Sequence, residues 1–126
     1  MIYLDNAATT KMSKTAINAM LPYLDGVYGN PSSLHSAGQE AKEALEDARR
    51  RLAALLNCDP TELTFTSGGS EADNQAILSA ARMGERKGKK HIVSTVFEHH
   101  AVLHTLDKLK KEGFEITLLD VHENGL

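Results

Sequence analysis

Apolar residues recur at helical spacing most clearly over residues 36–57. Charged residues occupy the opposite positions of this segment, so the pattern predicts an amphipathic helix. Ser36 and Gln39 have the spacing of a capping box at its start, and Asp59-Pro60 is expected to end it. The apolar stripe consists of Ala41, Ala44, Leu45, Ala48, Leu52, Leu55 and Leu56.

A shorter helical pattern covers residues 13–26, with Ser13 as the expected N-cap. Pro22 lies late in this segment and is expected to bend or shorten the helix. The residues before it, 2–10, begin with β-favouring side chains and continue into turn-forming ones. Residues 26–36 are rich in Gly, Asn, Pro and Ser, which predicts a loop.

The second half of the chain alternates between strand and helix patterns. Strands are predicted over residues 63–67, 90–96 and 114–121, and helices over residues 70–88 and 99–113. Strands that alternate with helices through short turns are typical of a parallel sheet with right-handed crossovers. The fold class predicted from the sequence is therefore α/β.

The last residues, 123–126, have the composition of a turn directly after the third predicted strand. A parallel sheet rarely leaves an edge uncovered, because its unpaired backbone groups attract other strands. We therefore expect this chain to be the N-terminal part of a larger protein.

The turn Ser67-Gly68-Gly69-Ser70 joins a predicted strand to a predicted helix. Amides at a helix start lack partners within the helix and carry the positive end of its dipole. Glycines let an anion approach such amides, and the serine hydroxyls add donors, so the turn is a candidate phosphate site. A plain capping turn, with Ser70 and Asp73 in capping-box spacing, explains the same residues. Neither GxGxxG nor GK[ST] is present, which disfavours a dinucleotide or a magnesium nucleotide.

Glu98, His99 and His100 follow the next predicted strand, where the chain turns into a helix. Ligands of open α/β sheets gather at the carboxyl ends of strands, and a histidine there can stack on an aromatic ligand or move a proton. His100 and His104 share a helix face, but no third ligand is evident, which disfavours a metal site. Surface or capping histidines are the remaining interpretation.

Composition narrows the class of protein. With 41% hydrophobic and 25% charged residues, the chain resembles neither a disordered nor a membrane-spanning protein. The net charge of −3, with basic and acidic residues interspersed, argues against nucleic-acid binding. The single cysteine, Cys58, and the lack of a signal-peptide pattern favour a cytoplasmic location. Cys58 follows a predicted helix, whose negative end disfavours a reactive thiolate.

Four segments together resemble the NifS/IscS-type cysteine desulfurases, which belong to the class V branch of fold-type I pyridoxal-phosphate enzymes. The resemblance covers essentially the whole chain and implies a three-layer αβα fold with a mostly parallel sheet, incomplete here. It implies an N-terminal arm and substrate-side segment over residues 1–14, and the N-terminal part of the large cofactor-binding domain over residues 15–126. The four segments are YLDNAATT (3–10), YGNPSSLHSAGQEA (28–41), FTSGGSEADNQAI (65–77) and EHHAVLHT (98–105).

The resemblance also implies roles for individual residues. Gly69 binds the phosphate of pyridoxal 5'-phosphate through its amide, and Ser70 through its amide and hydroxyl. His99 stacks on the pyridine ring and assists proton transfer, which would make it a catalytic as well as a cofactor-binding residue. Asn6 and Ala7 belong to the segment that approaches the substrate.

The activity implied by the resemblance is the conversion of L-cysteine to L-alanine, with the sulfur held as an enzyme persulfide for iron–sulfur cluster or thio-cofactor assembly. A homodimer and a sulfur-acceptor scaffold protein are implied as partners. None of the nine lysines has the context of the family's cofactor-binding lysine, and Cys58 does not match the family's catalytic cysteine, which lies in a mobile loop. We therefore expect this chain alone to be inactive. A selenocysteine lyase, a class V aminotransferase and a non-catalytic binding module remain alternatives.

Overall fold

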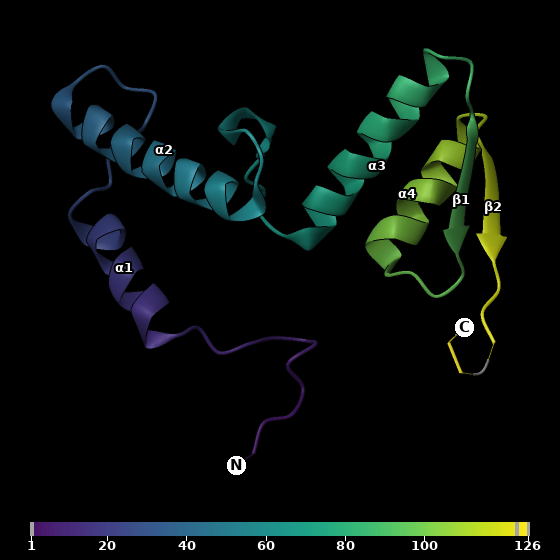
Figure 1. Cartoon of the computed structure of the whole chain (residues 1–126), viewed down its shortest axis with the longest axis horizontal. Coiled ribbons are helices and arrows are strands. Elements are labelled where there is room, and N and C mark those ends of the chain that lie inside the picture. The colour runs from purple at the N-terminus through teal and green to yellow at the C-terminus, as the bar shows by residue number, and fades with distance from the viewer. Residues whose placement is uncertain (1, 123, 126) are drawn as a thin grey trace. The chain divides into compact units, whose positions relative to one another are not determined.

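The computed structural model describes residues 2–122 and 124–125. The chain divides into two compact units, Met1–Thr64 and Phe65–Leu126 (Figure 1). The functional division expected at residue 14 stays a prediction. No helix in the described residues is both long enough and apolar enough to span a membrane.

The first unit contains α1 (Lys14–Asp25), α2 (Ser36–Leu56) and a short 3₁₀ turn, η1 (Pro60–Glu62). The predicted cap of α1 is confirmed, because the Ser13 hydroxyl accepts the Ala16 N–H at 3.1 Å. The two predicted helices are therefore present within a residue of their expected limits.

The cap of α2 differs from the prediction. His35 is the N-cap, and its Nδ1 accepts the Gly38 N–H at 3.3 Å, so the expected capping box of Ser36 and Gln39 is wrong. The Gln39 side chain instead donates to the Ser33 carbonyl oxygen at 3.1 Å. Histidine serves here because Nδ1 lies as far along the side chain as Oδ1 of asparagine, a preferred cap.

Replacing Ser13 with Ala is expected to lower the free energy of unfolding by about 1 kcal/mol, because a first-turn amide of α1 loses its acceptor. Ser13→Asp keeps an acceptor at this position and is the matched control. Urea denaturation of both variants measures the difference. An equal loss in the two variants would show that the cap does not stabilise α1.

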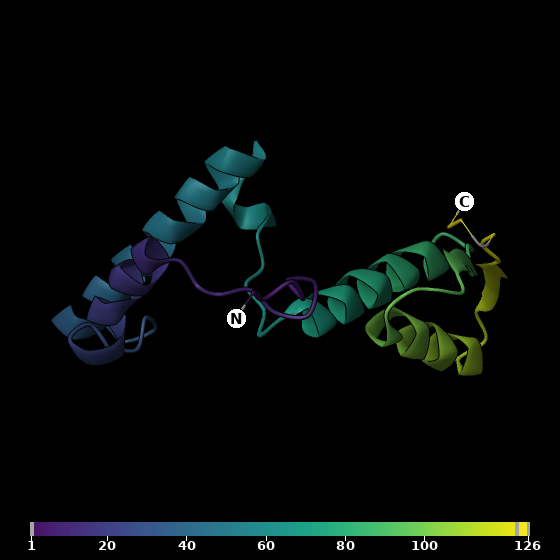
Figure 2. The ribbon, with the colours of Figure 1, turned by 90° about the horizontal axis from the view of Figure 1, so that it is seen from below.

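The second unit contains α3 (Gly69–Glu85), β1 (His91–Thr95), α4 (His100–Lys111) and β2 (Glu115–Leu119). The two strands pair in parallel, with Val93 opposite Thr117, so the predicted parallel pairing is confirmed. Figures 1 and 2 both show α4 beside α3 in this unit.

The first predicted strand, residues 63–67, is wrong. Leu63 is extended, with φ −92° and ψ 129°, but the sheet of the described residues consists of β1 and β2 alone. Extended residues become a strand only where a neighbouring strand supplies a ladder of hydrogen bonds. The side chains of this segment therefore predict an extended backbone, but they do not predict whether that backbone pairs with another strand.

The core of the second unit lies where the two helices meet the sheet. Leu109 is fully buried and packs with Ala81 and Phe114, and Ile92 of β1 and Ile116 of β2 lie against this cluster. These apolar contacts hold the two helices onto the parallel strands.

Charged side chains surround Phe114 at the end of the core. Arg82 pairs with Glu112 and Glu85, and Lys90 pairs with Glu85 at 2.7 Å. The Arg82 guanidinium and the Lys90 ammonium lie 5.9 and 5.4 Å from the centre of the Phe114 ring. Hydrogen bonds from Lys90 and then Arg82 hold the pKa of Glu85 below its usual range, and Glu112 raises that of Arg82.

The turn expected over residues 123–126 falls partly outside the described residues, which exclude Glu123 and Leu126. Of the remainder, Gly125 has φ +80°, and its N–H donates to the His122 carbonyl oxygen at 2.8 Å.

Candidate functional site

The helix α3 begins at the glycine turn. Gly68 is its N-cap in an extended conformation without a side-chain cap bond, Gly69 is its first residue and Ser70 its second. The expected cap at Ser70 is therefore wrong. The turn closes earlier because the Glu71 carboxylate accepts both the Ser67 N–H, at 2.7 Å, and the Ser67 hydroxyl, at 2.6 Å.

This helix start is open in front of its amides. A Cβ atom added to Gly68 or Gly69 would meet no atom within 4 Å. Gly69 and Ser70 stand in the first turn, where amides lack acceptors within the helix and the dipole is positive. The Ser70 side chain is exposed, so its hydroxyl is a further donor at the same place.

The two hydrogen bonds from Ser67 hold the pKa of Glu71 below its usual range, the hydroxyl contributing more than the amide. A lowered pKa in the folded state means that the ionised form stabilises the fold above the unfolded pKa. This contribution is lost as the pH falls through the folded value.

The Ser67→Ala variant removes the larger of these two hydrogen bonds, so the NMR titration midpoint of the Glu71 carboxyl should rise in it. An unchanged midpoint would contradict this cause.

His99 stands at the start of α4, the second helix of the candidate site. It is the N-cap of α4, and its Nδ1 accepts the Ala101 N–H at 3.1 Å. Because a backbone N–H can only donate, Nδ1 carries no proton while this bond exists. The neutral ring therefore holds its proton at Nε2, and the ring itself is exposed.

The starts of α3 and α4 line one pocket of about 390 Å³. The structure thus brings Ser70 and His99 together on one cavity. The lining residues are Ser70, Asn74, His99, His100, Ala101, His104, Thr105 and Lys108.

The other two candidate residues lie in the first unit. Asn6 and Ala7 form part of a turn in which the Ala8 N–H donates to the Asp5 carbonyl oxygen at 3.2 Å. The Thr10 hydroxyl closes the turn on the Asn6 carbonyl oxygen at 3.2 Å. Their place on the substrate side stays a prediction.

The neighbouring histidines stack on one another. The rings of His100 and His104 are 5.4 Å apart with an angle of 23° between their planes. Within the described residues no group of three or more His, Cys, Asp or Glu side chains is arranged to hold a metal ion.

Two residues of this pocket were missed from the sequence. The side chains of Asn74 on α3 and Thr105 on α4 hydrogen bond to each other at 2.6 Å. They are 31 positions apart, and no local pattern of the sequence links them.

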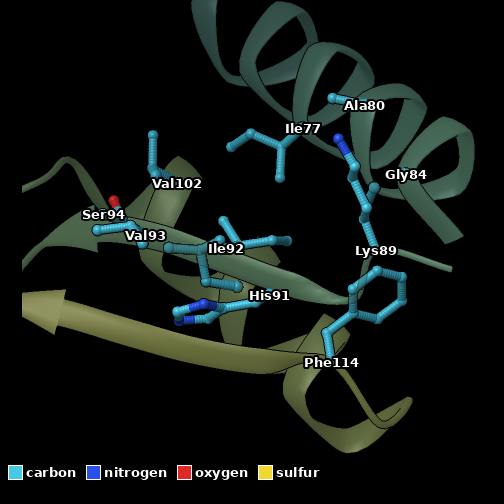
Figure 3. Close-up of a pocket in the computed structure, with 12 residues that line it drawn as sticks. Ile77, Ala80, Gly84, Lys89, His91, Ile92, Val93, Ser94, Val102 and Phe114 are labelled. Atoms are coloured by element: carbon cyan, nitrogen blue, oxygen red, sulfur yellow. The ribbon is translucent and has the colours of Figure 1, made fainter. Parts of the chain in front are cut away.

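A second pocket of the same unit, of about 400 Å³, lies between α3 and β1. Figure 3 shows Ile77, Ala80 and Gly84 of α3 on one side of it, and Ile92 of β1 on the other. Its lining is mainly apolar, and the one imidazole there, His91, lies 2.7 Å from the Thr117 hydroxyl. The pocket between the helix starts is therefore the better candidate for chemistry.

Comparison with known proteins places the chain in a family. The aminotransferase class-V family matches residues 2–126. The cysteine desulfurase IscS of Neisseria meningitidis serogroup C is 51% identical over 126 residues, which are 99% of this chain and 31% of that protein.

Solved structures agree with this match. A NifS-like protein superposes with a TM-score of 0.84 at 35% identity, over 92% of this chain and 32% of the other. SspA in complex with cysteine gives a TM-score of 0.83 at 35% identity, over 93% of this chain and 33% of the other.

The fold is that of a pyridoxal-phosphate transferase of the α/β class, as the sequence predicts. The chain belongs to the aminotransferase class-V family. It spans about a third of the length of the relatives it matches.

Proposed function

We propose that this chain is the part of a cysteine desulfurase that binds the phosphate of pyridoxal 5'-phosphate and covers one face of its ring. The observation that carries this proposal is the 51% identity to a protein named cysteine desulfurase over 126 residues, which are 99% of this chain. The pocket shared by Ser70 and His99 supports it, because two of the three proposed cofactor contacts lie on one cavity.

The donor set of the site fits the phosphate group. The Gly69 and Ser70 amides and the Ser70 hydroxyl are neutral donors at the positive end of α3, and the space in front of the glycines is open. When bound, the cofactor supplies an electron sink for carbanion chemistry.

His99 fits the ring and a proton-handling role. Its exposed imidazole can lie flat on an aromatic ring, and in the neutral state its Nε2–H is the available donor. A proton gained by this ring has to go to Nδ1, which breaks the bond from the Ala101 N–H. His99 therefore no longer caps α4 when its ring has accepted a proton.

The remaining parts of the proposal concern the whole enzyme. We propose L-cysteine as the substrate, a homodimer as the assembly and a sulfur-acceptor scaffold protein as the partner, in the cytoplasm. Asn6 and Ala7 are proposed to approach the substrate. The cysteine bound to the structural neighbour SspA and the name of the Neisseria relative support the choice of substrate.

A chimera tests this function. Replacing the matching third of the Neisseria meningitidis enzyme with this chain should give a protein that forms alanine and sulfide from L-cysteine. The 126-residue chain alone, as a control, should form neither. Release of selenide without release of sulfide, or amino transfer to a keto acid, would instead favour a selenocysteine lyase or an aminotransferase. A folded chimera without any of these activities would favour a binding module.

A further inference from the structure

One side chain connects the two halves of the candidate site. The Asn74 Nδ2 lies 2.6 Å from the Ser70 carbonyl oxygen in the first turn of α3. The same nitrogen lies 3.4 Å from the Ala101 carbonyl oxygen in the first turn of α4. Because both partners are acceptors, the amide must present its NH₂ group to them and its oxygen elsewhere.

The oxygen of the Asn74 amide faces Thr105 of α4. The Thr105 hydroxyl donates to Asn74 Oδ1 at 2.6 Å and lies 2.8 Å from the Ala101 carbonyl oxygen. Thr105 is only 3% exposed and is a buried polar residue of this unit. The hydrogen bond to Asn74 joins side chains of two helices in a buried setting, so it favours one arrangement of those helices.

The position of this contact along the helices matters. The buried core residues Ala81 and Leu109 lie in the second halves of α3 and α4. Asn74 lies in the first half of α3 and reaches the first turn of α4. The apolar core therefore packs the second halves of α3 and α4 together. The contact between Asn74 and Thr105 joins their first halves, where the candidate site lies.

We propose that Asn74 and Thr105 form a polar clamp, defined by these two side chains, that positions Gly69 and Ser70 relative to His99. The inference rests on the proposed function, since it concerns a ligand that spans both helix starts. Pyridoxal phosphate is such a ligand, because its phosphate and its ring are held apart by a short, stiff linkage. Asn74 and Thr105 act through the residues they hold and are positioning residues.

The matched variants are Thr105→Val, which keeps the shape and loses the hydroxyl, and Thr105→Ser, which keeps the hydroxyl. In the chimera with the Neisseria meningitidis enzyme, Thr105→Val is expected to weaken pyridoxal phosphate binding by roughly tenfold, the effect of one lost hydrogen bond. The affinity for inorganic phosphate should be unchanged, because that probe uses the start of α3 alone. Thr105→Ser should behave like the unmodified chimera.

A double variant shows whether the two side chains act together. Asn74→Ala combined with Thr105→Val should weaken cofactor binding no more than Asn74→Ala alone, because that change already removes every hydrogen bond of the clamp between the two helices. Additive losses would overturn the clamp. So would an equal loss for inorganic phosphate, or a loss in Thr105→Ser as large as in Thr105→Val.

A measurement without the cofactor separates this inference from the proposed function. Residual dipolar couplings of the amides in the first turns of α3 and α4 should fit one rigid orientation in the unmodified chain and in Thr105→Ser. They should not do so in Thr105→Val. If the unmodified chimera binds no pyridoxal phosphate, the proposed cofactor site fails, and the couplings alone decide the clamp: one rigid orientation in Thr105→Val overturns it.

Discussion

Gly69→Pro is expected to weaken pyridoxal phosphate binding by roughly 10- to 150-fold while leaving α3 in place. Gly69 is the first residue of the helix, where proline is tolerated because its N–H has no helical partner. The preceding residue, Gly68, already has the extended conformation that proline requires of its neighbour. The substitution therefore removes one donor to the phosphate, and a hydrogen bond to a charged group contributes about 1.5–3 kcal/mol.

Gly69→Ala is the matched control for this change. It keeps the amide, and its Cβ would meet no atom within 4 Å, so cofactor binding should be retained. Titration of each variant with pyridoxal phosphate, followed by absorbance, gives the affinities, and circular dichroism reports the helix. Equal affinities of the Pro and Ala variants would exclude the Gly69 amide as a phosphate ligand.

The elements of the second unit show what sequence patterns predict well. The helix α4 and the strands β1 and β2 lie inside their expected ranges, because apolar periodicity reports which faces are buried. The segment 63–67 has the same kind of residues and forms no strand among the described residues. Its composition is compatible with an extended chain, but pairing depends on a neighbour that lies elsewhere in the sequence.

For the candidate site too, sequence patterns predict some features and miss others. The positions of the glycine turn and of His99 before helix starts could be predicted, because turn-forming residues and a helical pattern follow one another in the sequence. The two histidine N-caps could not, because histidine is not a preferred cap, yet His35 and His99 both accept an amide at Nδ1.

The contact between Asn74 and Thr105 was also beyond prediction. Polar residues on a helix usually face water, and only the packing of α3 against α4 brings these two together. The candidate residues at the two helix starts can thus be named from local sequence. The way the two helices are held together depends on a contact between distant residues.

The capping bond of His99 leads to a prediction that separates its three roles. His99→Asn keeps a side-chain acceptor for the Ala101 N–H but removes the aromatic ring. His99→Phe keeps a ring but removes the cap and the exchangeable proton. Both should lower kcat of the desulfurase chimera by roughly 10²- to 10⁴-fold, the usual contribution of a general acid–base group.

The two variants should differ in the other measurements. His99→Asn should bind pyridoxal phosphate roughly 2- to 13-fold more weakly, because stacking contributes about 0.5–1.5 kcal/mol, and should keep its stability. His99→Phe should keep its cofactor affinity and lose about 1 kcal/mol of unfolding free energy with the cap of α4. If kcat falls only in His99→Phe, loss of the helix cap is the cause and His99 transfers no proton. If it falls in both, as we expect, the same imidazole that caps α4 also handles the proton of the reaction.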